Sequence, residues 1–152
     1  MEDAGAPEGD AAATVALVRL GHERFNEGDV DGCLALLTED IEWHPAFGEA
    51  LIGASIYRGR EGFRRYFEQV HEVIDGFTVE PRELAVAGDY VVLEAAVSGR
   101  GRASGIDIST HLTIVWRVQG SLLAWGGTYF NRAEALAAVG LSEEELERIP
   151  EA

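Results

Sequence analysis

The chain has 152 residues, 47% of them hydrophobic and 26% charged, as is typical of one globular domain. A single cysteine excludes an internal disulfide framework and any metal site built from several cysteines. Acidic residues outnumber basic ones by 27 to 12, and the net charge of −15 disfavours nucleic acid as a partner. All the basic residues are arginine, which excludes Schiff-base lysine chemistry.

The ends of the chain differ in composition from its middle. The first ten residues carry Gly, Pro, Glu and Asp without apolar periodicity, so we expect a disordered tail over residues 1–10. An ordered domain over 11–141 and a helical turn with a tail over 142–152 follow. The acidic start lacks the basic region of a secretory signal. No stretch approaches the roughly 18 apolar residues of a membrane span. We therefore expect a cytoplasmic protein without membrane attachment.

Apolar residues at helical spacing predict three helices in the first half of the chain. They cover residues 11–27, 30–37 and 60–74, and the third has the clearest apolar stripe. Between the first two, Gly28 suits a left-handed helix end and Asp29 suits the cap of the next helix.

The second half of the chain reads mainly as strands joined by short turns. Strands are predicted over 41–44, 77–87, 90–99, 106–119 and 122–130. A short helix is predicted over 133–139, ended by Gly140. Pro81 predicts an edge or a bulge in its strand. This order predicts an α+β fold, with helices gathered on one face of a mostly antiparallel sheet.

Both faces of the late strands carry apolar residues. Leu112, Ile114 and Trp116 share one face, and Thr113 and Val115 share the other. A sheet covered on one face by its own helices would ordinarily have a wet opposite face. We therefore expect a second copy of the chain to cover the outer sheet face and form a homodimer.

Six short segments together resemble the SnoaL-like branch of the superfamily that also contains ketosteroid isomerase, limonene epoxide hydrolase and nuclear transport factor two. They are Phe25–Asp29, Leu37–Trp43, Tyr57–Gly62, Gly99–Gly105, Val115–Val118 and Asn131–Leu136. The resemblance covers about residues 14–141. It implies a cone-shaped α+β barrel, in which three helices close a strongly curved sheet around an apolar pocket. It also implies a homodimer and no cofactor.

The resemblance places three positions of ketosteroid isomerase on this chain. Its catalytic base falls at His44, directly before Pro45. Its two oxyanion donors fall at Gly21 and Ile114, which have no side-chain donor. Without these donors a dienolate would lose several kcal/mol of stabilisation, so we do not expect steroid isomerisation.

Three residues are the candidates for catalysis. An imidazole can transfer protons near neutral pH, and His44 ends a predicted strand. Alternation leaves open whether Trp43 or His44 faces the pocket. A histidine that only caps the strand end is the alternative. Tyr57 could donate to a substrate oxygen or pack under its loop. Tyr129 shares a strand face with Trp125 and Gly127, where the glycine leaves room for a ligand or only permits a bend.

The candidates for substrate binding are mainly aromatic and apolar. They are Trp43, His22, Phe63, Phe67, Ile114, Trp116, Trp125 and Gly127. His22 lies on the apolar stripe of the first helix and could replace a missing oxyanion donor, although a lone histidine there is more often a core residue. The four histidines are scattered singly, so we predict no metal site.

Three functions remain open. The first is a cofactor-free enzyme that performs acid–base chemistry on a hydrophobic small molecule. The second is a non-catalytic module that binds such a molecule in the same pocket. The third is a dimeric scaffold with an incidental pocket. If neither His44 nor a pair of titratable groups reaches the pocket, the binding function is favoured over the enzyme.

Overall fold

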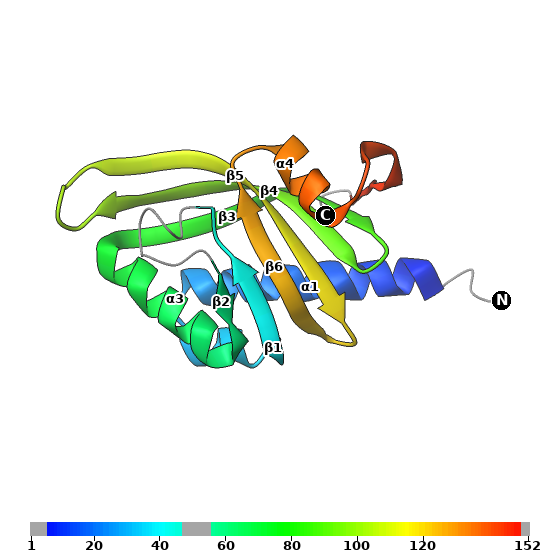
Figure 1. The fold of residues 1–152 in the computed structure, drawn as a ribbon, viewed down its shortest axis with the longest axis horizontal. Coiled ribbons are helices and arrows are strands. Elements are labelled where there is room, and N and C mark those ends of the chain that lie inside the picture. Colours follow the sequence, from blue (N-terminus) through cyan, green and yellow to red (C-terminus); the bar gives the residue numbers. More distant parts are fainter. Residues whose placement is uncertain (1–5, 47–55, 150–152) are drawn as a thin grey trace.

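The computed structural model describes residues 6–46 and 56–149 of the chain. The helices are α1 (Ala6–Asn26), α2 (Val30–Leu34), α3 (Gly59–Val73) and α4 (Arg132–Val139), with a 3-10 turn at Glu143–Glu145. The strands are β1 (Leu37–His44), β2 (Tyr57–Arg58), β3 (Ile74–Ala87), β4 (Tyr90–Gly101), β5 (Asp107–Gln119), β6 (Leu122–Tyr129) and β7 (Glu147–Ile149). The predicted α+β class is confirmed (Figure 1).

The helix ends follow the predicted capping residues. Gly28 ends α1 with a φ of 80°, and the Asp29 carboxylate accepts from the Gly32 N–H at 2.9 Å at the start of α2. Gly140 adopts the left-handed conformation after α4. Helix α1 begins at Ala6, five residues before the expected start of the ordered domain. Pro7 lies in its first turn, where a missing N–H removes no helical hydrogen bond.

The seven strands form one sheet in the order β2-β1-β6-β5-β4-β3-β7. Strand β1 pairs with β6 in parallel, whereas the remaining pairs of described strands are antiparallel. This pairing begins at Leu37, so β1 starts four residues before the strand expected from the sequence and α2 ends early. The tertiary contact with β6 thus overrides the local helical pattern.

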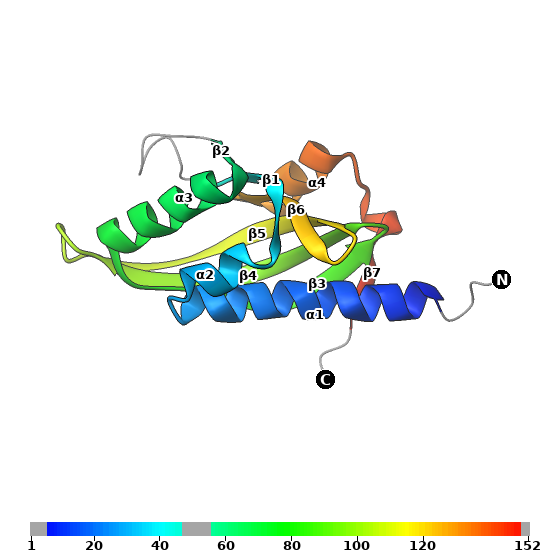
Figure 2. The ribbon, with the colours of Figure 1, turned by 90° about the horizontal axis from the view of Figure 1, so that it is seen from below.

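Bulges bend the long strands. The β3–β4 register shifts between Pro81 and Leu84, which confirms the irregularity predicted at the proline, and the β5–β6 register shifts between Arg117 and Val118. Helix α1 contacts β3, β4 and β6, while α3 contacts β1 and β3. Figure 2 shows the strands between these two helices, and the bent sheet with its helices matches the expected cone.

The two faces of the sheet have different partners. The inner face, which carries Leu112, Ile114 and Trp116, packs against α1 and α3 in the main core. The outer face carries Val92 and Val115, which form a second small core with Ala135 and Leu136 of α4. The chain's own C-terminal helix therefore covers part of the apolar outer face. The homodimer through this face stays a prediction.

Charged groups also join α4 to the outer face. The Glu94 carboxylate accepts hydrogen bonds from His111 Nε2 at 2.9 Å, Thr113 Oγ1 at 2.9 Å and Arg132 Nη1 at 2.6 Å. Arg132 also donates to Glu143 at 2.6 Å. Burial alone would raise the pKa of Glu94, but these hydrogen bonds outweigh it and hold the pKa below its ordinary value. The network fastens the C-terminal segment to β4 and β5.

No helix among residues 6–46 and 56–149 is both long enough and apolar enough to cross a bilayer.

Candidate functional site

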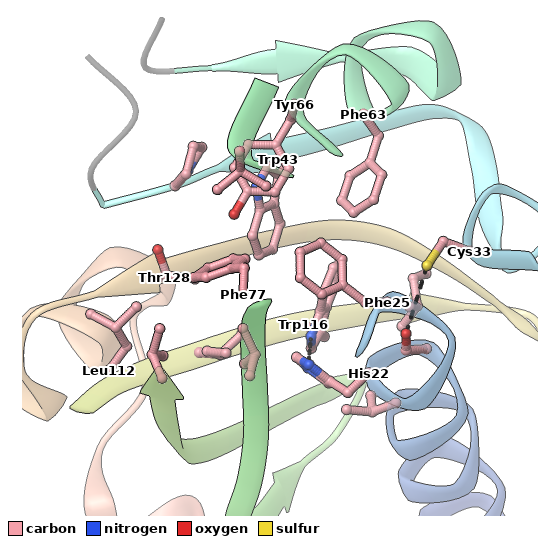
Figure 3. Close-up of a pocket in the computed structure, with 18 of the residues that line it drawn as sticks. His22, Phe25, Cys33, Trp43, Phe63, Tyr66, Phe77, Leu112, Trp116 and Thr128 are labelled. Carbon is pink, nitrogen blue, oxygen red and sulfur yellow. Dashed lines mark hydrogen bonds between the residues drawn. The ribbon is translucent and has the colours of Figure 1, made fainter. Parts of the chain in front are cut away.

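A cavity of about 240 Å³ lies between α1, α3 and the inner face of the sheet (Figure 3). Helix α1 contributes Val18, His22 and Phe25 to its wall, and α3 contributes Phe63 and Tyr66. Gly21 of α1 and Val70 of α3 also line it, and strands β1 and β3 to β6 supply the rest of the described lining, together with Cys33, Leu36 and Pro45. The helical stripe and the strand alternation therefore converge on one apolar space.

The described part of the cavity wall contains no Asp, Glu, Lys or Arg side chain. Its side-chain polar atoms come from six residues: His22, Cys33, Trp43, Tyr66, Trp116 and Thr128. An apolar pocket with a few placed polar groups is the usual form of a small-molecule site.

His22 and Trp116 form a buried pair in the wall. Trp116 Nε1 donates to His22 Nε2 at 3.1 Å, and the rings meet edge-on with centroids 6.1 Å apart. Because Nε2 accepts, the neutral imidazole carries its proton on Nδ1. Burial lowers the pKa of His22 to about 4, so the ring is uncharged at pH 7.

Trp43 lies between Trp116 and Tyr66 in the same wall. Its ring stacks on Trp116 with centroids 4.8 Å apart and an interplanar angle of 21°. The Tyr66 ring is tilted against it, with centroids 5.5 Å apart. The buried indole Nε1 of Trp43 has no hydrogen-bond partner. Burial raises the pKa of the Tyr66 phenol, which therefore stays protonated near neutral pH.

The two remaining polar groups already have partners. Thr128 Oγ1 accepts from the Ala46 N–H at 2.7 Å. The Cys33 thiol donates to the Gly21 carbonyl at 3.8 Å, and burial is the main reason that its pKa rises to about 12. Cys33 is thus a protonated thiol at pH 7 and not a nucleophile.

The three residues expected to catalyse lie outside the described cavity lining. His44 points to the outer face, where its Nε2 is 3.1 Å from Glu42 and its ring lies against Trp125. Tyr57 is buried beside α3 and donates to Gln69 Oε1 at 2.8 Å. Tyr129 packs at the edge of the small outer core. Alternation along β1 thus turns Trp43 inward and His44 outward, the question the sequence left open.

The residues expected to bind substrate divide in two. Trp43, His22, Phe63, Ile114 and Trp116 line the cavity, whereas Phe67, Trp125 and Gly127 do not.

Packing explains why Phe67, Trp125 and Gly127 do not line the cavity. Phe67 packs between Phe25 and His71, on the side of the α3 stripe away from the cavity. Trp125 and Gly127 share the outer face, and a Cβ at Gly127 would lie 2.9 Å from the Tyr129 hydroxyl. The space at Gly127 is therefore filled by Tyr129 rather than left for a ligand.

Sequence reasoning missed Tyr66, although the signal was present. Tyr66 follows Phe63 by three residues on α3 and so belongs to the same apolar stripe. It also missed Gly126, the inward-facing glycine of β6. A Cβ there would overlap the Trp116 ring and lie 3.0 Å from Trp43. Gly126 therefore makes room for the two stacked indoles.

In the described part of the chain, His, Cys, Asp and Glu side chains form no group of three or more that could hold a metal ion.

Several solved structures have the same fold. An NTF2-like protein of unknown function from Burkholderia pseudomallei has a TM-score of 0.71 and 21% identity, covering 82% of this chain and 95% of its own. TerC, co-crystallised with polyporic acid, has a TM-score of 0.70 and 19% identity, covering 85% and 97%. A Xanthomonas campestris protein, provisionally assigned as a polyketide cyclase, has a TM-score of 0.68 and 21% identity. The match covers 84% of this chain and 97% of that protein.

These identities establish a shared fold and nothing finer. Among curated proteins no match is found. The family comparison reaches further, because the SnoaL-like domain matches residues 18–125, which span the cavity-lining helices and most of the sheet. Because this match covers more than two thirds of the chain, the chain belongs to the SnoaL-like domain family.

Proposed function

We propose that the protein binds an apolar small molecule in the cavity between α1, α3 and the inner sheet face. The observation that carries this proposal is the cavity itself, which has a volume of about 240 Å³ and a wall of mainly hydrocarbon groups. A tightly packed core would leave no void of this size. The volume lies just below the roughly 300–1,000 Å³ of drug-sized pockets, so a bicyclic or small tricyclic molecule suits it.

Binding is favoured over catalysis by the positions of the titratable groups. His44 faces away from the cavity, and the described wall holds no carboxylate. His22 is uncharged at pH 7 and its Nε2 is occupied by Trp116. The co-crystallisation of TerC, which shares this fold, with the small molecule polyporic acid also supports ligand binding.

A thermal-shift screen against polyketide, terpenoid and steroid-like compounds tests the proposal. A ligand at about 100 times its Kd should raise Tm by roughly 5–10 °C through mass action. Val97→Phe would place a ring in the cavity and should abolish the shift. Its neighbour Ser98 is exposed and points to the opposite side of β4, so Ser98→Phe should leave the shift intact. Equal shifts in both variants would place the ligand elsewhere.

Proton transfer on the bound molecule is the second candidate function. Family membership supports it, and His22 is a titratable side chain in the cavity wall. If His22 transfers a proton in the reaction, His22→Gln should lower kcat by about 100-fold or more on a substrate found by the screen. His44→Ala should leave kcat unchanged. Full turnover by His22→Gln would leave ligand binding as the function.

A further inference from the structure

We propose that Trp43 and Tyr66 form a pair of hydrogen-bond donors for one oxygen atom of the ligand. The cavity would then select apolar ring molecules that carry a carbonyl group. This inference rests on the proposed ligand-binding function and names the chemical class that the cavity takes.

The first donor is the indole N–H of Trp43. Among the described residues, two buried side-chain polar atoms lack a hydrogen-bond partner, Thr38 Oγ1 and Trp43 Nε1. Of these two residues, Trp43 lines the cavity. Only 4% of Trp43 is exposed, so water does not readily reach its N–H. A buried donor without a partner costs free energy, and a ligand oxygen would recover it.

The second donor is the Tyr66 hydroxyl. Figure 3 shows Tyr66 and the indole nitrogen of Trp43 together at one end of the cavity, with His22 at the other. Tyr66 is 7% exposed, and burial keeps its hydroxyl protonated by raising the pKa. The Tyr66 and Trp43 rings are in contact, with centroids 5.5 Å apart. Their geometry nevertheless leaves Nε1 without a hydrogen bond.

The surroundings favour a neutral oxygen over a charged one. The described cavity wall has no Arg or Lys side chain to pair with a carboxylate or phosphate. Burying an unpaired anion there would cost far more than two neutral donors return. A carbonyl oxygen has two lone pairs, so it can accept from Trp43 and Tyr66 together. The aromatic rings around the pair suit a flat ring system attached to that carbonyl.

A matched pair of probes tests the inference. 1-Tetralone and tetralin have nearly the same shape and differ by the carbonyl group. Their Kd values, measured by calorimetry on the full chain, give a ketone-to-hydrocarbon ratio for each variant. Tyr66→Phe keeps the ring and removes one donor, so it should weaken 1-tetralone relative to tetralin by about fivefold. Trp43→Phe should shift the ratio in the same direction.

The carbonyl stretch of bound 1-tetralone provides a readout independent of affinity. Two hydrogen bonds should move it to lower frequency in the wild type, and Tyr66→Phe should move it part of the way back. Phe63→Leu is the control, since Phe63 lines the cavity without a polar atom. It should weaken both probes and leave their ratio unchanged.

Two results would overturn the inference, and they are distinguishable. If both probes bind but neither the ratio nor the stretch responds to Tyr66→Phe and Trp43→Phe, the donor pair is refuted and ligand binding stands. If neither probe binds the wild type and the compound screen also gives no shift, the ligand-binding function fails as well.

Discussion

Alternate residues of the same strands give the sheet two different faces, an inner face that borders a cavity and an outer face that is packed against α4. On β5, Ile114 and Trp116 face inward to a cavity, while Thr113 and Val115 face outward to α4 and the Glu94 network. The inner face borders an open cavity, and the polar groups in the described wall of that cavity are not Asp, Glu, Lys or Arg side chains. The outer face fills its space with the C-terminal helix and satisfies its charges with ion pairs.

The difference between the faces shows that a residue type suited to catalysis does not by itself indicate a position in the cavity. His44 and His111 contact the carboxylates of Glu42 and Glu94 on the outer face and do not reach the cavity. The polar groups that can meet a ligand are less obvious ones, an indole, a phenol and a neutral imidazole. Each following prediction tests this contrast between a receptive inner face and a structural outer face.

The largest effect is expected from filling the inner face at Gly126. Gly126→Val would force Trp116 and Trp43 out of their stacked arrangement, because even a Cβ there overlaps the Trp116 ring. We expect a loss of about 3 kcal/mol in the free energy of unfolding, measured by chemical denaturation.

Gly21→Ala is the matched control. A Cβ at Gly21 meets Leu123 and Leu36 at ordinary contact distances of 3.7 and 3.8 Å, and the position is helical. The change should stabilise the protein by up to about 1 kcal/mol. Equal losses in both variants would show that Gly126 has no special place beneath the indoles.

Acid should act on the inner face first, through His22. Its pKa is about 4 in the folded protein and about 6.5 when unfolded, so the unfolded chain binds the extra proton between these values. Stability is therefore complete above pH 6.5 and falls as the pH drops towards 4, by on the order of 3 kcal/mol.

His22→Gln separates this effect from general acid unfolding. Glutamine offers an acceptor to Trp116 Nε1 but does not titrate. Denaturation curves from pH 7 to pH 4 should be flatter for this variant. Parallel curves for the two proteins would mean that His22 is not a buried neutral group.

The outer network should respond at lower pH. The Glu94 pKa is depressed, so its contribution is present above pH 4.5 and is lost as the pH falls through the folded value. Glu94→Gln should cost about 1–2 kcal/mol at pH 7, since it removes the charge that Arg132 and His111 contact. That cost should shrink below pH 4.5. The ligand-induced thermal shift should persist, because Glu94 does not line the cavity.

The smallest effect is expected at His44. Its side chain is 27% exposed and its partner Glu42 is 37% exposed, so their hydrogen bond is worth less than about 1 kcal/mol. His44→Ala should leave ligand binding unchanged in the thermal-shift assay. A marked loss of binding would place His44 in the site and blur the contrast between the two faces.

The helices, most strands and their turns could be predicted because their signals are local. The apolar stripe of α3, the caps at Asp29 and Gly140, and the inward set Leu112, Ile114 and Trp116 all follow from periodicity and residue type.

The site was harder to predict because it depends on long-range pairing. The direction of His44 follows from how β1 joins β6 in parallel, and no neighbouring residue encodes that contact. The apolar outer face suggested a partner subunit, yet α4 folds back to cover Val92 and Val115. Local pattern shows which residues avoid water but not which part of the molecule shields them.

The parallel contact between β1 and β6 has a consequence for how the molecule is made. Trp43 emerges from the ribosome long before Gly126, its neighbour across that contact. Until β6 has been synthesised, the cavity lacks one of its walls, and α1 and α3 cannot pack against a complete sheet. Such distant contacts slow folding, because a long loop must close before they form. A ligand can therefore bind only after β6 has paired with β1. Its binding would oppose unfolding of the folded protein and would not promote the early steps of folding.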